Sequence, residues 1–157
     1  MVLTDRRRPA TPMQMAHPLE IRIRDAYAAF GRGDLDGYLR ACTEDFKFHV
    51  PGHGGVTGSY VGREGLHELA RKVMGISGGT FQEEVEDVLS NDRHAVVLAR
   101  HRLVREGIPR EYRTAHVYEI AEGKLAACFE QPRDPTGFDE AWGPSQGAAQ
   151  GGGKRGE

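Results

Sequence analysis

The sequence is poor in cysteine and has no long hydrophobic run. Its 157 residues include only two cysteines, Cys42 and Cys128, and neither belongs to a CxxC pair or lies near a tight histidine pair. We therefore expect no disulfide framework and no zinc site, and we interpret both cysteines as small core residues in a reducing compartment. No apolar stretch is long enough to cross a bilayer, and residues 1–20 lack the apolar segment of a secretory signal. The sequence thus predicts a cytoplasmic protein that makes no contact with a membrane.

An excess of charge of one sign is also absent. The formal net charge is −2, although 28% of the residues are charged, so no basic field indicates a nucleic-acid partner. The motifs GxGxxG, GxxxxGK[ST], GxSxG and HExxH do not occur, which removes the usual signatures of nucleotide-binding proteins, serine hydrolases and zinc proteases. We therefore predict neither a cofactor nor a metal ion.

Composition divides the chain into one domain and two tails. Residues 1–17 contain prolines and scattered polar residues without a period, and residues 144–157 are rich in glycine. We predict that both segments are disordered. The remaining residues, 18–143, are enough for one hydrophobic core and too few for two ordinary domains.

The first half of this domain has the patterns of helices. Apolar residues at helical spacing predict a helix that begins at Pro18 and is stopped by Gly31 and Gly33. Asp34 can cap a second helix, and a third is expected over about residues 63–74.

Strand periodicity marks the other segments. Residues 46–50 alternate and are followed by a glycine-rich loop over residues 52–62. Three or four strands then follow in series, over residues 80–89, 94–105, 110–121 and 124–131. Their short connections force antiparallel neighbours, and Phe138 and Trp142 could form a last helical turn. We predict an α+β fold in which three N-terminal helices pack on one face of a curved, mostly antiparallel sheet.

An ordered set of short motifs resembles SnoaL-like proteins, which belong to the superfamily named after nuclear transport factor two. The resemblance covers about residues 20–143. Its motifs are the run Ala26–Gly37, Pro51-Gly52 after the first strand, Gly58-x-Tyr60-x-Gly62-Arg63, Gly123-Lys124-Leu125 and Phe138-Asp139-Glu140-x-Trp142. The resemblance implies a cone whose sheet and helices enclose a deep pocket for an apolar small molecule, and it implies a homodimer. It implies no single activity, because this fold hosts many chemistries.

The superfamily that the sequence resembles includes ketosteroid isomerases, polyketide cyclases and limonene-type epoxide hydrolases. The isomerase uses an Asp as general base, and it uses a Tyr and a second Asp to bind the developing oxyanion. The matching positions here hold Val50, Ala26 and Ala115. Because Val and Ala can neither accept nor donate a proton, we reject steroid isomerisation by that mechanism.

A predicted cluster of polar side chains on the pocket wall carries the functional hypothesis. Strand alternation, aligned with the family, turns His101, Arg113 and Glu130 inward, and hairpin arithmetic brings His101 opposite Arg113. In this cluster His101 could carry a proton, Arg113 could hold an enolate or carboxylate oxygen, and Glu130 could orient either group. His49 is the second candidate proton carrier. The predicted ligand-lining residues are Phe48, Val50, Tyr60, Ala99, Leu103, Ala115, Val117, Cys128 and Trp142.

The inward face of each strand is an alternative that the sequence leaves open. One missed bulge would invert the faces, because side chains alternate with period two. The residues that would then turn inward are Arg100, Arg102, Tyr112, Thr114 and His116. The acidic run over residues 83–87 is interpreted as a solvated face.

Four functions remain as hypotheses. The first is a cofactor-free isomerase or cyclase that transfers a proton on an apolar carbonyl compound. The second is a non-catalytic ligand-binding or dimerisation module that uses the same pocket. The third is an epoxide hydrolase, since Glu111, Arg113 and Glu130 loosely match the Asp, Arg and Asp that such an enzyme needs. The last is a protein-interaction module that acts through the open face of the sheet.

Overall fold

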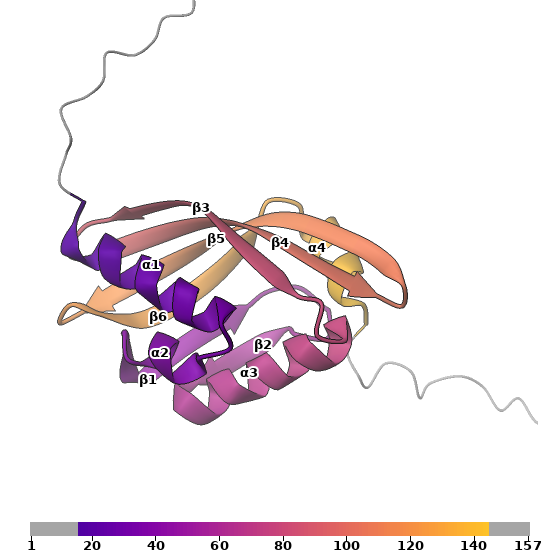
Figure 1. Ribbon diagram of the computed structural model, residues 1–157, viewed down its shortest axis with the longest axis horizontal. Coiled ribbons are helices and arrows are strands. Elements are labelled where there is room, and N and C mark those ends of the chain that lie inside the picture. Colours follow the sequence, from indigo (N-terminus) through magenta and orange to yellow (C-terminus); the bar gives the residue numbers. More distant parts are fainter. Residues whose placement is uncertain (1–15, 145–157) are drawn as a thin grey trace, which may run out of the picture.

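The computed structural model describes residues 16–144, and Figure 1 shows its helices and strands. The predicted disordered tails lie almost entirely outside the described residues. The elements in chain order are α1 (Pro18–Gly31), α2 (Leu35–Leu39), β1 (Cys42–Val50), β2 (Gly58–Val61), α3 (Gly62–Ser77), β3 (Gln82–Ser90), β4 (His94–Arg105), β5 (Ile108–Ala121), β6 (Lys124–Pro132) and α4 (Pro135–Trp142).

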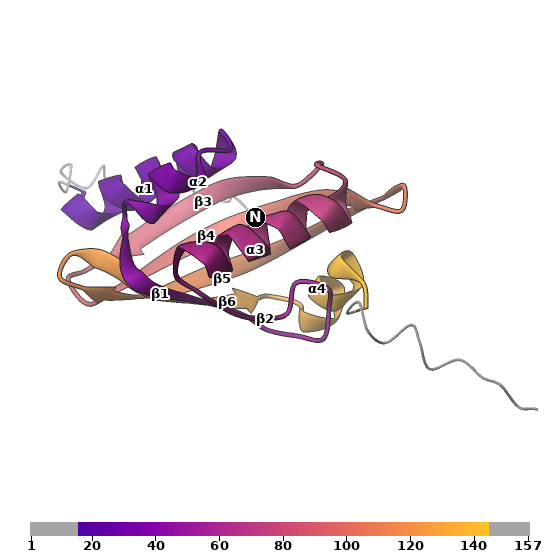
Figure 2. The same ribbon diagram turned by 90° about the horizontal axis from the view of Figure 1, so that it is seen from below.

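One six-stranded sheet in the order β2-β1-β6-β5-β4-β3 forms the body of the fold. All neighbours are antiparallel except β1 and β6. In Figure 2, α1, α2 and α3 lie on one side of the curved sheet, and α4 lies near one end. The predicted α+β class, with a mostly antiparallel sheet curved under three N-terminal helices, is confirmed. None of the four helices between residues 16 and 144 is long and apolar enough to cross a membrane.

The helix ends follow the local chemistry of the sequence. His17 and Asp34 cap α1 and α2 by accepting hydrogen bonds from backbone N–H groups. The helix α3 ends at Gly78, whose φ of +58° is a left-handed conformation that glycine adopts without strain. The predicted helices therefore begin and end close to the observed ones. The strand β2 was not predicted, because its four residues lie inside a glycine-rich segment.

Two tight turns set the register of the last three strands. Glu106 and Gly107 both have positive φ, as do Glu122 and Gly123, which is typical of two-residue hairpin turns. The first turn pairs Arg105 with Ile108, so His101 lies opposite Tyr112 and not opposite Arg113. The predicted register of this hairpin was therefore wrong by one residue.

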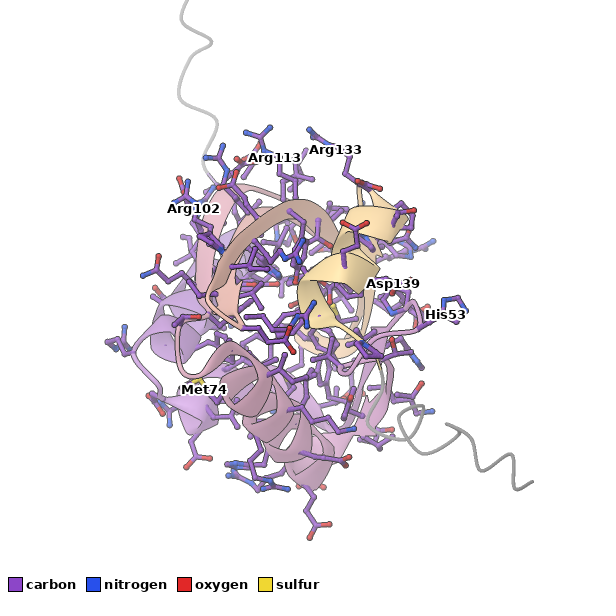
Figure 3. The ribbon with its side chains drawn as sticks, turned by 90° about the vertical axis from the view of Figure 1, so that its right-hand side faces the viewer. His53, Met74, Arg102, Arg113, Arg133 and Asp139 are labelled. Carbon is purple, nitrogen blue, oxygen red and sulfur yellow. The ribbon has the colours of Figure 1, made fainter. Side chains whose placement is uncertain are left out.

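Because of this one-residue difference, every side chain of β5 points to the face opposite the predicted one. Tyr112, Thr114, His116 and Tyr118 are buried on the inner face. The three residues predicted to face inward lie on the outer face: Arg113, Ala115 and Val117. Figure 3 shows Arg113 pointing away from the body of the molecule, near Arg102 of β4.

The inner faces of β4 and β6 agree better with the sequence. Val97, Ala99, His101 and Leu103 of β4 are all buried, as predicted. On β6, Cys128 and Glu130 are buried, whereas Ala126 lies at an irregularity in the pairing of β5 with β6 and is only half-buried. Both cysteines are free and buried, and burial raises the pKa of the Cys42 thiol to about 12.

Candidate functional site

A narrow cavity lies between the helices and the inner face of the sheet. Its empty space, mouth included, is about 620 Å³, although the centre of a water molecule can reach only about 70 Å³ of it. Its apolar lining consists of Phe30, Phe48, Val50, Val56, Leu66, Leu69, Ala70, Val73, Phe81 and Trp142. Its polar lining consists of Tyr27, Tyr38, Glu83, His101, Tyr112, His116 and Glu130. A mostly apolar wall with a few convergent polar groups is typical of small-molecule sites.

A wider groove leads into the cavity across the edge strand β3. The two spaces share Tyr27, Phe30, Ala70, Val73, Phe81 and Glu83. The groove is also lined by Arg24, Arg100 and Arg102, each of which lies within 4.0 Å of a carboxylate. These arginines are already paired with carboxylates, so none of the three offers an unpaired cation to a ligand.

Four neighbouring strands each contribute one residue to a His–Glu cluster, which consists of Glu83, His101, His116 and Glu130. Glu83 pairs with His101 across β3 and β4, and His116 pairs with Glu130 across β5 and β6. Residues directly opposite in a ladder share a face of the sheet, which is why all four meet in the cavity. The two imidazole centroids are 5.4 Å apart.

Both ring nitrogens of His101 have hydrogen-bond partners. Nε2 lies 2.6 Å from Glu83 Oε2, and Nδ1 lies 2.8 Å from Tyr112 Oη. Trp142 Nε1 donates to the same Tyr112 oxygen over 2.9 Å. Glu130 Oε1 lies farther from His101 Nδ1, at 3.8 Å. The side chain of His101 is therefore fixed at both ends.

His116 ends a chain of three tyrosine hydroxyls. Tyr27 Oη lies 2.5 Å from His116 Nδ1 and 2.6 Å from Tyr118 Oη, which lies 2.7 Å from Tyr38 Oη. Burial raises the pKa of all three hydroxyls well above its ordinary value, so they remain neutral donors. This chain occupies only one of the two nitrogens of His116.

The other nitrogen of His116 and one oxygen of Glu130 are buried without hydrogen-bond partners among the described residues. His116 Nε2 lies 3.7 Å from Glu130 Oε1. Burial by itself lowers the pKa of His116, but the carboxylates of Glu130 and Glu83 raise it above its ordinary value. Burial by itself raises the pKa of Glu130, but His116 lowers it overall. Each group thus favours the charged form of the other, imidazolium and carboxylate, and each keeps one free atom.

Comparison with known proteins now identifies the family. The profile of the SnoaL-like domain matches residues 23–128. The chain belongs to the SnoaL-like family. It is 29% identical over 121 residues to the uncharacterized protein Rv0034 of Mycobacterium tuberculosis, an alignment that covers 76% of this chain and 92% of that protein.

Solved structures place this SnoaL-like protein among nuclear transport factor 2-like folds. Bal32a, from a soil-derived mobile gene cassette, is 28% identical with a TM-score of 0.74, and the match covers 80% of this chain and 96% of Bal32a. TerC, crystallised with polyporic acid, is 21% identical with a TM-score of 0.71, over 80% of this chain and 98% of TerC. The resemblance inferred from the short motifs is confirmed.

Some of the predicted site residues lie where the sequence placed them. His101 and Glu130 lie in the cavity wall of this SnoaL-like protein, together with Phe48, Val50 and Trp142. A second set is buried but does not reach the cavity: Tyr60, Ala99, Leu103 and Cys128. The hydroxyl of Tyr60 donates to the backbone oxygen of Val56 over 2.7 Å instead.

Two predicted catalytic residues lie on the outer face of the sheet. Arg113 points outward in the observed register, which differs from the predicted one by one residue. There its Nε donates to Glu86 Oε1 over 3.1 Å. His49 Nδ1 lies 2.8 Å from Ser59 Oγ, and its ring stacks on Phe129 with centroids 4.6 Å apart. The placement of both residues at the pocket was wrong, since alternation along β1 turns Phe48 and Val50 inward instead. Ala115 and Val117 are the other outward residues.

Several residues of the cavity were not predicted from the sequence. Tyr112 and His116 appeared only in the alternative with inverted faces, although the Glu106-Gly107 turn signal could have identified that register. Glu83 belongs to an acidic run that was interpreted as a solvated face, and the other acidic members of this run are exposed. Tyr27 follows Ala26, the residue that the family alignment had selected.

Glu83, His101 and His116 also have the spacing of metal ligands. One donor atom of each lies within 4.8 Å of the others. The nitrogens of His101 and Nδ1 of His116 are, however, already hydrogen-bonded to Glu83, Tyr112 and Tyr27. An ion at this position would have to displace the His101–Glu83 hydrogen bond, so the donor set fits hydrogen bonding better than coordination.

Proposed function

We propose that this protein binds an apolar carbonyl compound in its cavity and transfers a proton on it, as an isomerase or cyclase does, without a cofactor. The observation that carries the proposal is the pair of unpartnered atoms, His116 Nε2 and Glu130 Oε1, 3.7 Å apart in an apolar wall. Buried polar atoms are almost always paired, so a pair without partners is available to a ligand.

The two groups have complementary roles in this reaction. The Glu130 carboxylate removes a proton from the carbon next to the carbonyl, and the His116 imidazolium donates its Nε2 proton to the carbonyl oxygen. The product is an enol, with Glu130 protonated and His116 neutral. When Glu130 returns its proton to another carbon while His116 takes back the proton of the enol oxygen, an isomerisation is complete. When the enol carbon instead attacks a second carbonyl, a ring closes: the new alkoxide takes the proton from Glu130, and the enol oxygen returns its proton to His116 as the first carbonyl forms again. Environments that push two titratable groups in opposite directions are typical of such acid–base pairs.

Two features support a small organic ligand. The cavity wall is mostly aromatic and aliphatic, with a few polar groups that converge on it, as in small-molecule sites. TerC, whose fold is similar, was crystallised with polyporic acid. Neither feature names the ligand of this protein.

Binding without turnover is the second candidate. The space open to the centre of a water molecule is only about 70 Å³, and Val50 replaces the general base of the isomerases. A ligand held tightly by an apolar wall needs no proton transfer. This candidate predicts saturable binding and a ligand that is recovered unchanged.

Deuterium incorporation separates the two candidates. The purified protein is incubated with cell extract, and the ligand found by native mass spectrometry is returned to the protein in D₂O. Proton transfer at carbon introduces deuterium, which raises the mass of the released ligand even when the product is an isomer. We expect Glu130→Gln to slow this exchange by about 10²–10⁴-fold and His49→Ala, a change on the outer face, to leave it unchanged. Equal exchange with Glu130→Gln would contradict the proposed acid–base pair, and a ligand recovered without deuterium would favour binding alone.

We also propose a homodimer that forms through the outer face of the sheet. This face exposes Leu98, Val104 and Phe129 between paired charges of both signs, such as Arg102 with Glu111. Light scattering after size-exclusion chromatography tests it, and Phe129→Glu should give a monomer. A wild-type protein that is monomeric at micromolar concentration would rule it out.

A further inference from the structure

The hydrogen bonds around Tyr112 assign the proton positions of His101. Tyr112 Oη accepts from Trp142 Nε1 over 2.9 Å and lies 2.8 Å from His101 Nδ1. An indole N–H is a donor only, so Trp142 cannot accept the hydroxyl hydrogen of Tyr112. Among the described residues, His101 Nδ1 is the only other atom hydrogen-bonded to this hydroxyl. Tyr112 therefore donates to Nδ1, and Nδ1 carries no hydrogen.

The other nitrogen of His101 follows from this assignment. A neutral imidazole carries one hydrogen, which must then be on Nε2, 2.6 Å from Glu83 Oε2. A carboxylate accepts that hydrogen without rearrangement. The protonated alternative would leave the hydroxyl hydrogen of Tyr112 without an acceptor, although Tyr112 is only 6% exposed.

We propose that Tyr112 and Trp142 are positioning residues that hold His101 as its neutral Nε2–H tautomer. The tautomer of a histidine is set by the hydrogen bond at its other nitrogen. The tautomer itself does not depend on the proposed function. The consequence for catalysis rests on it: His101 is a fixed donor to Glu83, and proton transfer falls to His116 and Glu130.

The last helix holds this arrangement in place. Trp142 is the final residue of α4, and Arg105 of β4 donates from Nε to the Ala141 carbonyl over 3.0 Å and from Nη2 to the Glu140 carbonyl over 2.8 Å. The last carbonyls of a helix lack partners inside the helix, so Arg105 satisfies two of them. The end of α4, and with it the indole of Trp142, is thereby tied to the strand that carries His101.

Nitrogen NMR of the full chain, with ¹⁵N-labelled histidine, measures the tautomer directly. We expect His101 to show an unprotonated Nδ1 and a protonated Nε2 in the wild type. In Tyr112→Phe, Nδ1 loses its donor and faces Glu130 Oε1 at 3.8 Å, so its signal should shift to that of a protonated nitrogen. Trp142→Phe should shift it in the same direction by less, because the Tyr112 hydroxyl loses one fixed partner. Tyr27→Phe is the matched control and should alter His116 only.

Two results overturn the proposal. The first is a protonated Nδ1 on His101 in the wild type, and the second is an unchanged His101 spectrum in Tyr112→Phe. If Tyr112→Phe does not fold, the wild-type spectrum and Trp142→Phe still decide the question. None of these measurements needs a substrate, so they stand even if the proton-transfer activity proposed above is not found.

Discussion

His101 and His116 lie side by side on one face of the sheet, and Nδ1 of each is hydrogen-bonded to a tyrosine hydroxyl. Each also faces a carboxylate, but at different distances. Glu83 is within hydrogen-bond distance of His101 Nε2, at 2.6 Å, whereas Glu130 stands 3.7 Å from His116 Nε2. One histidine is therefore saturated, while the other keeps a free atom beside a free carboxylate oxygen. Two pairs of the same chemistry thus differ by about 1 Å in separation, and only the wider pair has the free atoms that the proposed proton transfer needs.

The largest loss of stability is expected when the charge of Glu130 is removed. Glu130→Ala leaves His116 without its nearest compensating charge in a buried site, so we expect a loss of about 3–5 kcal/mol in the free energy of unfolding. Urea titration measures it. Glu111→Ala, which removes an exposed partner of Arg102, is the control and should leave the urea midpoint in place. A small loss for Glu130→Ala would mean that the buried charges are already compensated elsewhere.

A smaller effect should follow from breaking the tyrosine chain at its centre. Tyr118→Phe removes a hydroxyl that bonds both Tyr27 and Tyr38, leaving buried groups unsatisfied at a cost of about 1–3 kcal/mol. Tyr38→Phe removes only the end of the chain and should cost less. Thermal unfolding of the two variants gives the order, and the reverse order would show that the chain does not act as a unit.

The turn that brings His116 next to His101 can be tested at Gly107. This glycine has a φ of +75°, so Gly107→Ala should destabilise the protein by about 1–2 kcal/mol. Gly75→Ala is the control, because Gly75 lies inside α3 with nothing within 4 Å of an added methyl group. That change should instead stabilise by about 0.5–1 kcal/mol. Equal effects of the two changes would contradict the backbone argument.

The weakest expected effect is on the pH dependence of stability. The pKa of His116 is raised above 6.5, so its contribution is complete below that value and is lost as pH rises through the raised pKa. The pKa of Glu130 is lowered below 4.5, so its contribution is complete above that value and is lost as pH falls through the lowered pKa. The urea midpoint should therefore fall when the pH rises through the pKa of His116 and also when it falls through the pKa of Glu130. His116→Gln and Glu130→Gln should each flatten both sides, because each residue causes the pKa shift of the other, whereas profiles parallel to the wild type would count against the pair.

Local sequence patterns predicted the elements well, because their signals are local. Pro18 and Gly31 bound the first helix as expected, and the alternation of β4 correctly placed His101 inward. Glu130 was also predicted at the site. These predictions needed only the period of one element and its flanking residues.

The functional pair could not be predicted in the same way, because it depends on how β5 aligns with its neighbours. Alignment with the family selected the alternate set, with Arg113, Ala115 and Val117, as the inner face. The true inner set includes Thr114 and His116, because this face builds a polar site as well as a core. A site residue thus breaks the pattern that would otherwise identify it.

The sequence by itself determined the order of the elements other than β2, the cap of α2 at Asp34, and the inward face of β4, since propensity and periodicity act over a few residues. The tertiary structure decided which face of β5 joins the cavity, because a two-residue turn fixes a register in which every one-residue step exchanges the faces. The tertiary structure also decided that Glu83, unlike its acidic neighbours, is hydrogen-bonded to His101, and that Trp142, near the end of the domain, is hydrogen-bonded to Tyr112. Those contacts join segments distant in sequence, so no local pattern could specify them.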